Sequence, residues 1–385
     1  MMDDWPMLAE EERLFCDVLT RICANEIAPK AARTDEDATF VRDQLAVLGE
    51  AGMMGANLHE DYDGSGISAP ALLRAVAIVA GACGSTASAL TAHYLATDSI
   101  LIGGTEAQRR EWLPRAATGA ALGAFALTEP TAGSDPADMK TRARRTDTGW
   151  HLKGTKCFIS NGGEADFIVV YAVTDPDKAH RGISAFILPR GTPGLEPGPA
   201  ERTMGLKGGH VFTLNIDCQL PADAVLGDEG KGFRTAMQVL DNGRIEVAAQ
   251  CLGLAGAAME AAIAYAKDRV IGGQALTDRQ GIRWMIADMG VAYRQALLIA
   301  QDAARQRQAA HEGTGGRFSL AAAMAKLAAS EAAGRIADTA LQLHGGYGYT
   351  RDFPVERINR DLRIMRIYEG SSEIQRNIIS GNMLA

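Results

Sequence analysis

The sequence predicts an α+β fold in which a helical segment comes first, a segment of strands second and another helical segment last. Three observations predict this order. Apolar residues recur at three- and four-residue spacing near the start, short runs rich in β-branched and aromatic residues occupy the middle, and long alanine-rich stretches fill the end. The chain has 385 residues, 47% of them hydrophobic, which is enough for two or three domains.

Residues 1–120 are predicted to be helical. The stretch "RLFCDVLTRIC" places its apolar side chains on one helical face. Thr105 is followed three residues later by Gln108, the pattern of a capping box at a helix start. Ser68 follows the loop "HEDYDGSGIS" and is expected to cap the next helix.

Residues 121–230 are predicted to form strands. Four short runs, "GWHLKGTKCFIS", "ADFIVVYAVT", "GISAFILPRG" and "FTLNIDCQLP", are rich in β-branched and aromatic residues. Glycine, proline and aspartate turns separate these runs. The sequence therefore predicts a β domain in the middle of the chain.

Residues 231–385 are predicted to be helical again. A long alanine-rich stretch begins at "TAMQVLDNGRIEVAAQ", and residues 279–312 and 318–343 follow the same pattern. Small side chains let helices approach closely, so these segments are expected to pack as a bundle.

Composition excludes several classes of protein. The net charge of -8 argues against nucleic acid or an anionic membrane as a partner. No run of about 20 apolar residues predicts a membrane helix, and no basic region followed by an apolar stretch predicts a signal peptide. The six cysteines form no CxxC pair and the histidines no HExxH motif, so no metal is expected. We therefore expect a cytoplasmic protein with reduced thiols.

Two stretches of the β segment carry residues suited to a planar ligand. "FALTEPTAGSD", from Phe125 to Asp135, offers hydroxyl donors and a glycine that leaves backbone N–H groups accessible. "KCFISNGG" offers the ring of Phe158 to cover a ligand and the hydroxyl of Ser160 to bond its edge. Read alone, the first is equally a loop of turn residues, and the second a hairpin with an Asn-Gly turn.

Two further stretches lie near the C-terminus. "LQLHGGYGYTRDFPVER" is either a helix end followed by a loop, or a place where backbone approaches a cofactor closely. Neither GxGxxG after a strand nor GxxxxGKS occurs, so the stretch is not a Rossmann or P-loop motif. "IYEGSSEIQR" sets a carboxylate, Glu369, at a break between two helical stretches.

Together these four stretches, in this order, resemble the signatures of the FAD-dependent acyl-CoA dehydrogenases. The resemblance covers nearly the whole chain. It implies a helical N-terminal domain, a β-barrel-like middle domain and a C-terminal four-helix bundle, with boundaries near residues 120 and 230. It also implies a homotetramer in which two subunits touch each FAD.

The resemblance further implies the groups that bind FAD and substrate. Phe125, Leu127, Thr128, Gly133, Ser134, Phe158 and Ser160 would surround the flavin, and Ser371 and Glu373 would form a flavin-binding turn. Arg269, Gln280, Gln342, Gly345 and Gly346 would reach the FAD of a neighbouring subunit. Ser134, Asp241, Arg244, Tyr368 and Gly370 would contact the acyl-CoA. The alternative for Arg244 is a surface salt bridge.

By the same resemblance, Glu369 is the base that removes the α-proton of an acyl-CoA. The β-hydrogen would leave as hydride to flavin N5, giving a trans-2-enoyl-CoA, and electron-transferring flavoprotein would reoxidise the cofactor. Ser372 and Gln375 could form a capping box, which would place the carboxylate before a helix start that favours the anion. Burial beside Tyr368 would instead raise its pKa, so the two influences tune the base towards neutral pH.

The chain departs from the family pattern at three places, one of which is the stretch "MGLKGGHVFTL", where Gly209 and Val211 replace the usual serine and threonine. Gly272 replaces an aromatic residue that usually follows the arginine at 269, so one packing contact near the neighbouring flavin is in doubt. Some family branches carry the base immediately before the arginine at 244, but here that residue is Gly243. Glu246 does not fit that offset and is interpreted as an ordinary polar residue of a helix.

Other functions remain open at this point. The scaffold could support an acyl-CoA oxidase or a desulfinase, or a non-catalytic acyl-CoA-binding protein; the intact Glu369 favours dehydrogenation. The expected substrate is a short or branched acyl-CoA from fatty acid metabolism or amino acid catabolism. Tyr94, four residues after Leu90, would block long chains if it pointed into the acyl pocket, and would otherwise be a core or surface residue.

Overall fold

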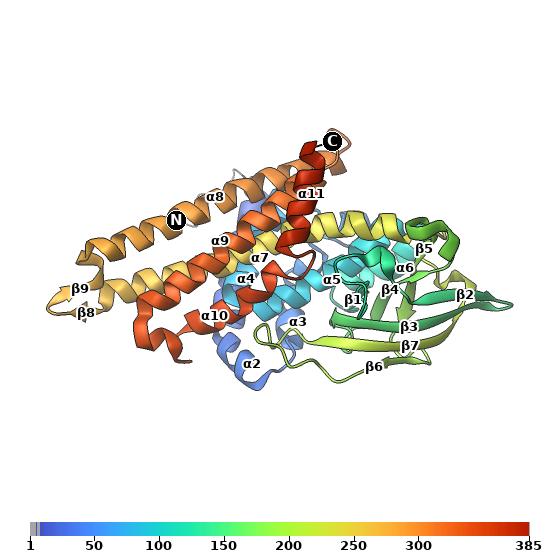
Figure 1. Cartoon of the computed structure of the whole chain (residues 1–385), viewed down its shortest axis with the longest axis horizontal. Helices are drawn as coiled ribbons and strands as arrows, with labels where there is room; N and C mark the ends of the chain where they lie inside the picture. The colour runs from blue at the N-terminus through green and yellow to red at the C-terminus, as the bar shows by residue number, and fades with distance from the viewer. Residues whose placement is uncertain (1–4, 6–7, 385) are drawn as a thin grey trace.

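The structure is a computed structural model that describes residues 5 and 8–384. Long helices form one part of the molecule, and a curled sheet lies at one end of them (Figure 1). The helices of the N-terminal domain are α1 (Glu10–Ile22), α2 (Ala31–Asp37), α3 (Arg42–Glu50), α4 (Ala69–Ala82), α5 (Gly84–Gly103) and α6 (Glu106–Ala117).

Both predicted caps of the N-terminal domain are confirmed. The Ala71 N–H donates to the Ser68 hydroxyl at 3.3 Å, which starts α4. At the start of α6, the Gln108 N–H donates to the Thr105 hydroxyl at 3.3 Å, and the Thr105 N–H donates back to the Gln108 side chain at 3.0 Å. Each bond satisfies a backbone donor that the helix itself leaves unpaired.

The middle domain is a curled sheet of seven strands, which confirms the predicted β domain. The strands are β1 (Gly123–Ala126), β2 (Arg142–Thr146), β3 (Gly149–Ser160), β4 (Phe167–Val173), β5 (Ile183–Pro189), β6 (Leu195–Pro197) and β7 (Val211–Pro221). Their order is β1-β4-β2-β3-β7-β6, with β5 paired to β4. The β1–β4 pair is parallel, whereas β3–β7 and β4–β5 are antiparallel.

Strand β4 lies between two hydrophobic cores. Phe167 and Tyr171 belong to a core that β4 shares with α6, where Trp112 lies with its ring centroid 5.1 Å from that of Phe167. Ile168 and Val170, on the opposite face, belong to the core inside the curled sheet. Because side chains alternate along a strand, a strand buried on both faces must be apolar throughout, and this explains the continuous run "FIVVYAV".

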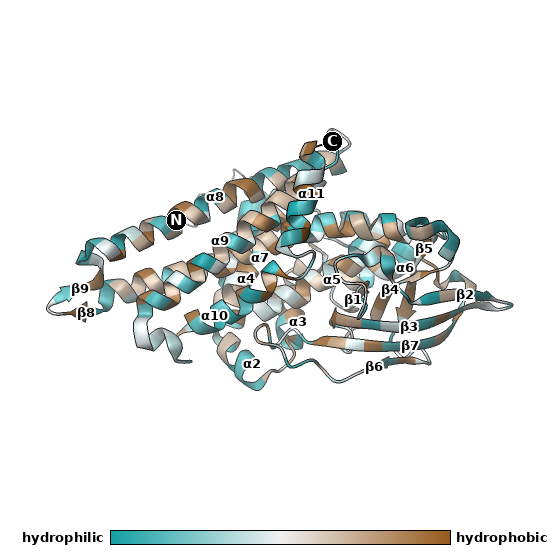
Figure 2. Ribbon diagram, viewed as in Figure 1, coloured by the Kyte–Doolittle hydropathy of each residue, from teal (hydrophilic) through white to brown (hydrophobic). Residues whose placement is uncertain are grey.

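The C-terminal domain is helical. It contains α7 (Gly232–Asp268), α8 (Gln280–His311), α9 (Ser319–His344), α10 (Pro354–Arg363) and α11 (Ser372–Leu384), with a short hairpin of β8 (Val270–Ile271) and β9 (Gln274–Ala275) between α7 and α8. Helices α7, α8 and α9 pack together, and α4 of the N-terminal domain joins them. Hydrophobic and hydrophilic residues are banded along these helices, as expected for helices with buried faces (Figure 2).

Helix α7 is the centre of this bundle. Within the described part of the chain it is the one helix long and apolar enough to cross a membrane by length and composition. However, 72% of its apolar window is buried inside the protein. The core helix of a bundle gives the same signal.

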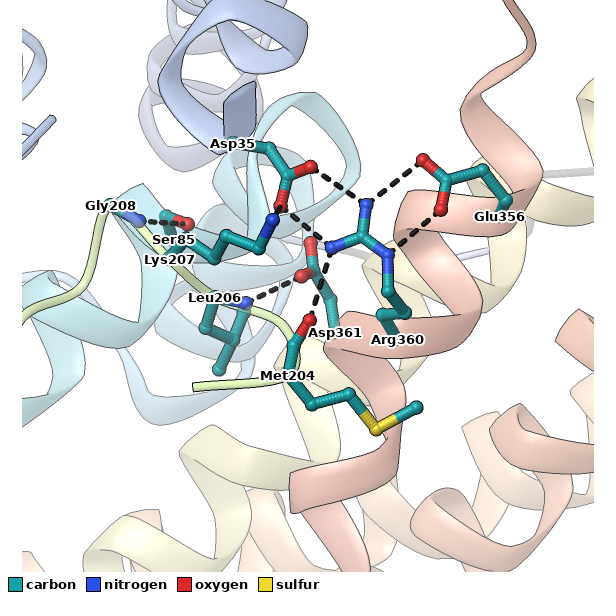
Figure 3. A network of polar contacts seen from close by, with 9 residues as sticks. All are labelled: Asp35, Ser85, Met204, Leu206, Lys207, Gly208, Glu356, Arg360 and Asp361. Carbon is teal, nitrogen blue, oxygen red and sulfur yellow. Dashed lines mark hydrogen bonds and ion pairs between the residues drawn. The ribbon is translucent and has the colours of Figure 1, made fainter. Parts of the chain in front are cut away.

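One arginine ties the three domains together (Figure 3). Arg360 of α10 donates to both carboxylate oxygens of Asp35 in α2, at 2.8 and 2.7 Å, and to Glu356 at 2.9 Å. It also donates to the Met204 carbonyl, in the loop between β6 and β7, at 3.1 Å. A bidentate guanidinium–carboxylate bond fixes orientation as well as distance, so α2, α10 and this loop hold one arrangement.

Candidate active site

Glu369 lies in a strained turn between a 3-10 helix, Ile364–Arg366, and α11. Its φ is 51°, and that of Gly370 is 90°, both in the left-handed region. A glutamate rarely adopts this conformation, which costs about 1–3 kcal/mol unless the surroundings enforce it. Here Lys326 of α9 donates to the Gly370 carbonyl at 2.7 Å. The Gln375 amide donates to the carbonyls of Glu369 and Gly370 at 3.1 and 2.9 Å.

The helix that follows the turn starts differently from the prediction. The predicted capping box between Ser372 and Gln375 is wrong. Ser371 is the capping residue, and its hydroxyl accepts the Ile374 N–H at 3.4 Å. The Ser372 hydroxyl donates to Glu331 instead, at 2.7 Å. The side chain of Gln375 is thereby left to bond the carbonyls of the strained turn.

The Glu369 carboxylate fills a space that a missing side chain leaves on α7. A Cβ atom built on Gly243 would lie 2.1 Å from Glu369 Oε2 and 2.8 Å from the Cδ2 atom of Leu95 on α5. Oε2 is buried and accepts no hydrogen bond among the described residues. A buried carboxylate oxygen without a donor is a strong acceptor, and the glycine is what makes room for it.

Burial raises the pKa of Glu369 to about 7, against the opposing charges of Lys326 and Arg244. The carboxylate is therefore close to half ionised at neutral pH. A base whose pKa matches the working pH combines a populated anion with enough driving force to take a proton.

Replacing Lys326 with methionine tests this balance. Because the positive charge of Lys326 lowers the pKa of Glu369, we expect Lys326→Met to raise that pKa and move the rise of the pH–rate profile to higher pH. Each unit of upward shift costs about tenfold in rate well below the pKa. Flavin reduction measured from pH 6 to 9 checks this. Lys178→Met, which removes an exposed lysine, should leave the profile in place; an equal loss of rate at every pH in Lys326→Met would mean that Lys326 acts on position alone.

Other predicted substrate-binding residues gather around the base. Arg244 directly follows Gly243 on α7 and donates to Asp241, which also accepts from Ser319. Arg244 therefore forms a salt bridge with Asp241. This salt bridge does not lie on the surface, because the Arg244 side chain is only 8% exposed. The Tyr368 hydroxyl donates to the Gln250 side-chain oxygen at 3.1 Å.

The two predicted flavin-binding stretches of the middle domain are brought side by side. The Cys157 N–H donates to the Thr128 carbonyl at 3.0 Å. Phe158 sits where the β3–β7 register shifts, with φ of 57° and a ring that is 70% exposed. A bulge of this kind redirects a side chain, here out of the sheet to a position where it can cover a planar ring.

A buried ion pair that the sequence did not reveal supports this region. The Lys156 ammonium lies 2.8 Å from Glu129 and donates to the Leu127 carbonyl at 2.9 Å. Glu129 in turn accepts the Thr141 N–H at 3.0 Å. Gly133 and Ser134, by contrast, are exposed, and a Cβ on Gly133 would meet no atom within 4 Å. The ion pair of Lys156 and Glu129 therefore fixes the start of this loop, while the loop tip at Gly133 and Ser134 stays accessible.

The residues predicted to reach the FAD of a neighbouring subunit lie at the far end of α7, whereas Ser371 and Glu373 lie at the start of α11 beside the base. A groove of about 590 Å³ is lined by Arg269, Gln342, Gly345 and Gly346. Cβ atoms on either glycine would meet nothing within 4 Å, so the backbone is open to a ligand. The Arg269 guanidinium lies 5.6 Å from the Tyr347 ring centroid. Gln280, the first residue of α8, is exposed near this end but does not line the groove.

The groove and the base are far apart in one chain. Glu369 packs against Gly243, and the 25 residues of α7 from there to Asp268 rise roughly 37 Å. The structure thus divides the predicted cofactor site into two parts at separate positions along α7.

Family comparison agrees with the geometry. Residues 9–120, 124–217 and 230–384 match the profiles described as the N-terminal, middle and C-terminal domains of acyl-CoA dehydrogenase. The chain belongs to the acyl-CoA dehydrogenase family. It is 39% identical over 381 residues to acryloyl-CoA reductase (NADH) of Anaerotignum propionicum, covering 98% of this chain and 95% of that protein. It is 40% identical over 378 residues to a short-chain specific acyl-CoA dehydrogenase of Clostridium acetobutylicum, covering 98% of each.

Solved structures give the same result. Butyryl-CoA dehydrogenase from Megasphaera elsdenii superposes with a TM-score of 0.95 at 38% identity, covering 98% of this chain and 99% of that one. The protein is a FAD-dependent acyl-CoA dehydrogenase. When bound, FAD supplies the hydride acceptor. The open glycines and the cation of the distal groove suit its phosphates, and the exposed Phe158 suits its ring.

The chain's own residues perform the other parts of the reaction. Glu369 Oε2 is free to accept a proton, and its lack of a hydrogen-bond donor makes it the stronger acceptor. Lys326 and Gln375 fix the turn that carries it. The buried helix interface around Gly243 and Leu95 keeps water from the base.

Two interpretations of single residues are settled by burial. Tyr94 is fully buried, belongs to the main core and donates its hydroxyl to the Met53 carbonyl, so the core alternative holds. The interpretation of Glu246 as an ordinary polar helix residue is wrong. Glu246 is 2% exposed and paired with Arg307 of α8.

Proposed function

We propose that this acyl-CoA dehydrogenase oxidises a short or branched acyl-CoA to its 2-enoyl-CoA in the cytoplasm. The observation that carries the proposal is the Glu369 carboxylate, buried against Gly243 with one oxygen left free to accept a proton. The names of the similar proteins, short-chain specific and butyryl-CoA dehydrogenase, support a short acyl group.

The test is anaerobic flavin bleaching with saturated acyl-CoAs from C4 to C16 and with branched C4 and C5 thioesters. We expect the highest kcat/KM among the C4 and C5 substrates. Each methylene that the site cannot accommodate changes specificity by about 1–3 kcal/mol. A preference for C12 or longer would contradict the short-chain proposal, while a lack of bleaching by every thioester would contradict dehydrogenation itself.

The direction of the reaction is a second question, because one similar protein is named as an acryloyl-CoA reductase that uses NADH. Our proposal is oxidation, with electrons passing to electron-transferring flavoprotein. Turnover with that protein, compared with turnover under oxygen and with NADH plus an enoyl-CoA, distinguishes a dehydrogenase from an oxidase and a reductase.

We also propose a homotetramer that shares FAD between subunits, and the divided site supports the sharing. The flavin-covering Phe158 lies in the sheet domain beside the start of α7, whereas Arg269 lies past its end. Because the two parts lie towards opposite ends of α7, we assign them to two different copies of the chain around each cofactor. A second copy that places its groove beside the sheet domain of the first completes the site.

Removing the distal cation tests this sharing. We expect Arg269→Ala to lose FAD on dilution or gel filtration, because a charge-assisted bond to phosphate contributes about 1.5–3 kcal/mol. Flavin absorbance per subunit, measured together with molecular mass, reports the result. Arg283→Ala, which removes a nearby exposed arginine bonded to the Thr277 carbonyl, serves as the control. If Arg269→Ala remains a tetramer and holds FAD as tightly as wild type, the shared site is contradicted.

A further inference from the structure

A buried charged pair lies behind the base and has no part in proton transfer. Glu246 of α7 is 2% exposed and Arg307 of α8 is 3% exposed. The Arg307 Nη1 atom donates to Glu246 Oε1 at 3.2 Å. Such a pair is costly to bury unless its remaining atoms are also bonded.

Two further atoms of this pair have no hydrogen-bond partner among the described residues. These atoms, Glu246 Oε2 and Arg307 Nε, are both buried. The nearby carboxylate of Asp98 accepts from the amides of Asn57 and Asn242 at 2.6 and 2.7 Å, and the side-chain oxygens of both asparagines are also unpartnered. Several acceptor atoms and one donor atom therefore lie together in the interior without hydrogen bonds to one another. Each unpaired buried atom of this kind costs about 1–3 kcal/mol of stability.

Glu246 lies one helical turn along α7 from the glycine that contacts the base. That glycine, Gly243, touches the Glu369 carboxylate, and Glu246 is on the same side of α7. Burial is the main cause of the raised pKa of Glu246, and the charge of Arg307 opposes it. The charge of Glu369 raises this pKa further, so the two carboxylates interact. From Asn242 to Gly256 the helix is continuously buried, so this direction leads into the protein.

The separation selects a position on the acyl group. Three residues of helix rise about 4.5 Å, and an extended chain advances about 1.2 Å per bond, so this rise is the length of about three to four bonds. Three bonds beyond the α-carbon, an acyl group carries the substituent of its fourth carbon. An alkyl end at this place would leave the polar atoms unpaired, whereas a polar substituent would bond them.

The charges select a neutral substituent. A carboxylate would lie among Glu246, Asp98 and Glu369, and an ammonium would meet the Arg307 guanidinium. Burial raises the pKa of Glu246, and the charge of Arg307 opposes this shift. A hydroxyl can accept from Arg307 Nε and donate to Glu246 Oε2, so it matches the two unpartnered atoms together.

We propose that Glu246 and Arg307 bind a hydroxyl group on the fourth or fifth carbon of the acyl chain, so that the preferred substrate is a short hydroxyacyl-CoA. This inference rests on the proposed function, because it takes Glu369 as the base and α7 as a wall of the acyl site. The reaction remains the established one: the α-hydrogen leaves as a proton to Glu369, the β-hydrogen as hydride to FAD, and the hydroxyl is unchanged. The product is a 4- or 5-hydroxy-2-enoyl-CoA.

The test compares kcat/KM for butyryl-CoA and pentanoyl-CoA with that for 4-hydroxybutyryl-CoA and 5-hydroxypentanoyl-CoA. A site built to bond a hydroxyl rejects the analogue that lacks it strongly, so we expect wild type to prefer one hydroxylated substrate by about 100-fold or more. The double variant Glu246→Leu/Arg307→Met removes both charges together and avoids an orphaned buried ion. It should lose that preference or reverse it while keeping FAD.

Glu246→Gln and Arg305→Met complete the experiment. Glu246→Gln keeps the size of the side chain and should reduce the preference for the hydroxylated substrate. It provides the test if the double variant fails to fold. Arg305→Met removes an exposed arginine of α8 and should leave the preference unchanged. Equal or better use of butyryl-CoA by wild type would overturn the inference, as would an equal loss for both classes of substrate in Glu246→Gln, because a purely structural pair would give that result. Absence of turnover with every thioester would instead contradict the proposed function.

Discussion

Glu369→Gln should bind FAD and acyl-CoA as wild type does but reduce the flavin about 10²–10⁴-fold more slowly. The amide keeps the shape of the side chain and removes the proton acceptor. The Glu369 and Gly370 carbonyls that Lys326 and Gln375 bond are backbone atoms, so the turn itself should be retained. Anaerobic stopped-flow reduction, with FAD content and acyl-CoA affinity measured on the same preparation, checks this expectation.

Glu312→Gln is the matched control, because Glu312 directly follows α8 and is exposed. It should reduce its flavin at close to the wild-type rate. Near wild-type reduction by Glu369→Gln would show that another group takes the proton. Glu246 is the nearest candidate in charge and burial, and a rate carried by Glu246 would fall in Glu246→Gln.

The order of the three domains could be predicted because each is dominated by local periodicity. Strand β4 was recognisable from its apolar run, and the caps at Ser68 and Thr105 follow from side chains that bond backbone within three residues. The hairpin of β8 and β9 was not predicted. Its strands have two residues each, too short to show a period, and its turn depends on positive φ at Gly272 and Gly273.

The site shows what local patterns leave out. Motifs pointed to Glu369, but its left-handed backbone depends on Lys326 of α9 and on Gln375, whose side chain reaches back across the turn. The capping-box prediction failed because the spacing of Gln375 fits two roles, that of a capping-box residue and that of a donor to the carbonyls of the turn. Lys326 itself gave only a weak signal, a lysine within the alanine-rich run "AAAMAKLAAS" that the rest of the helix buries.

Glu246 was misread for a related reason. A single charged residue on a long helix is usually solvated, and its partner Arg307 is 61 residues away on another helix. The buried pair of Lys156 and Glu129, separated by 27 residues, was missed in the same way. Pairing across elements is a property of the packed structure, so sequence spacing carries no information about it.

Gly243→Ala should slow flavin reduction by about 100-fold without loss of FAD. The added Cβ would lie 2.1 Å from Glu369 Oε2 and 2.8 Å from Leu95, so the carboxylate must move. A shift of about 1 Å in a reacting group costs about 10²-fold in rate. Alanine is a better helix former than glycine, so α7 itself should not be weakened. Flavin reduction rate, FAD content and thermal stability are measured together. Gly381→Ala, at a helical position where a Cβ meets nothing within 4 Å, is the control. A wild-type rate in Gly243→Ala would mean that the carboxylate does not work from the position beside α7, and the assignment of its free oxygen as proton acceptor would be wrong.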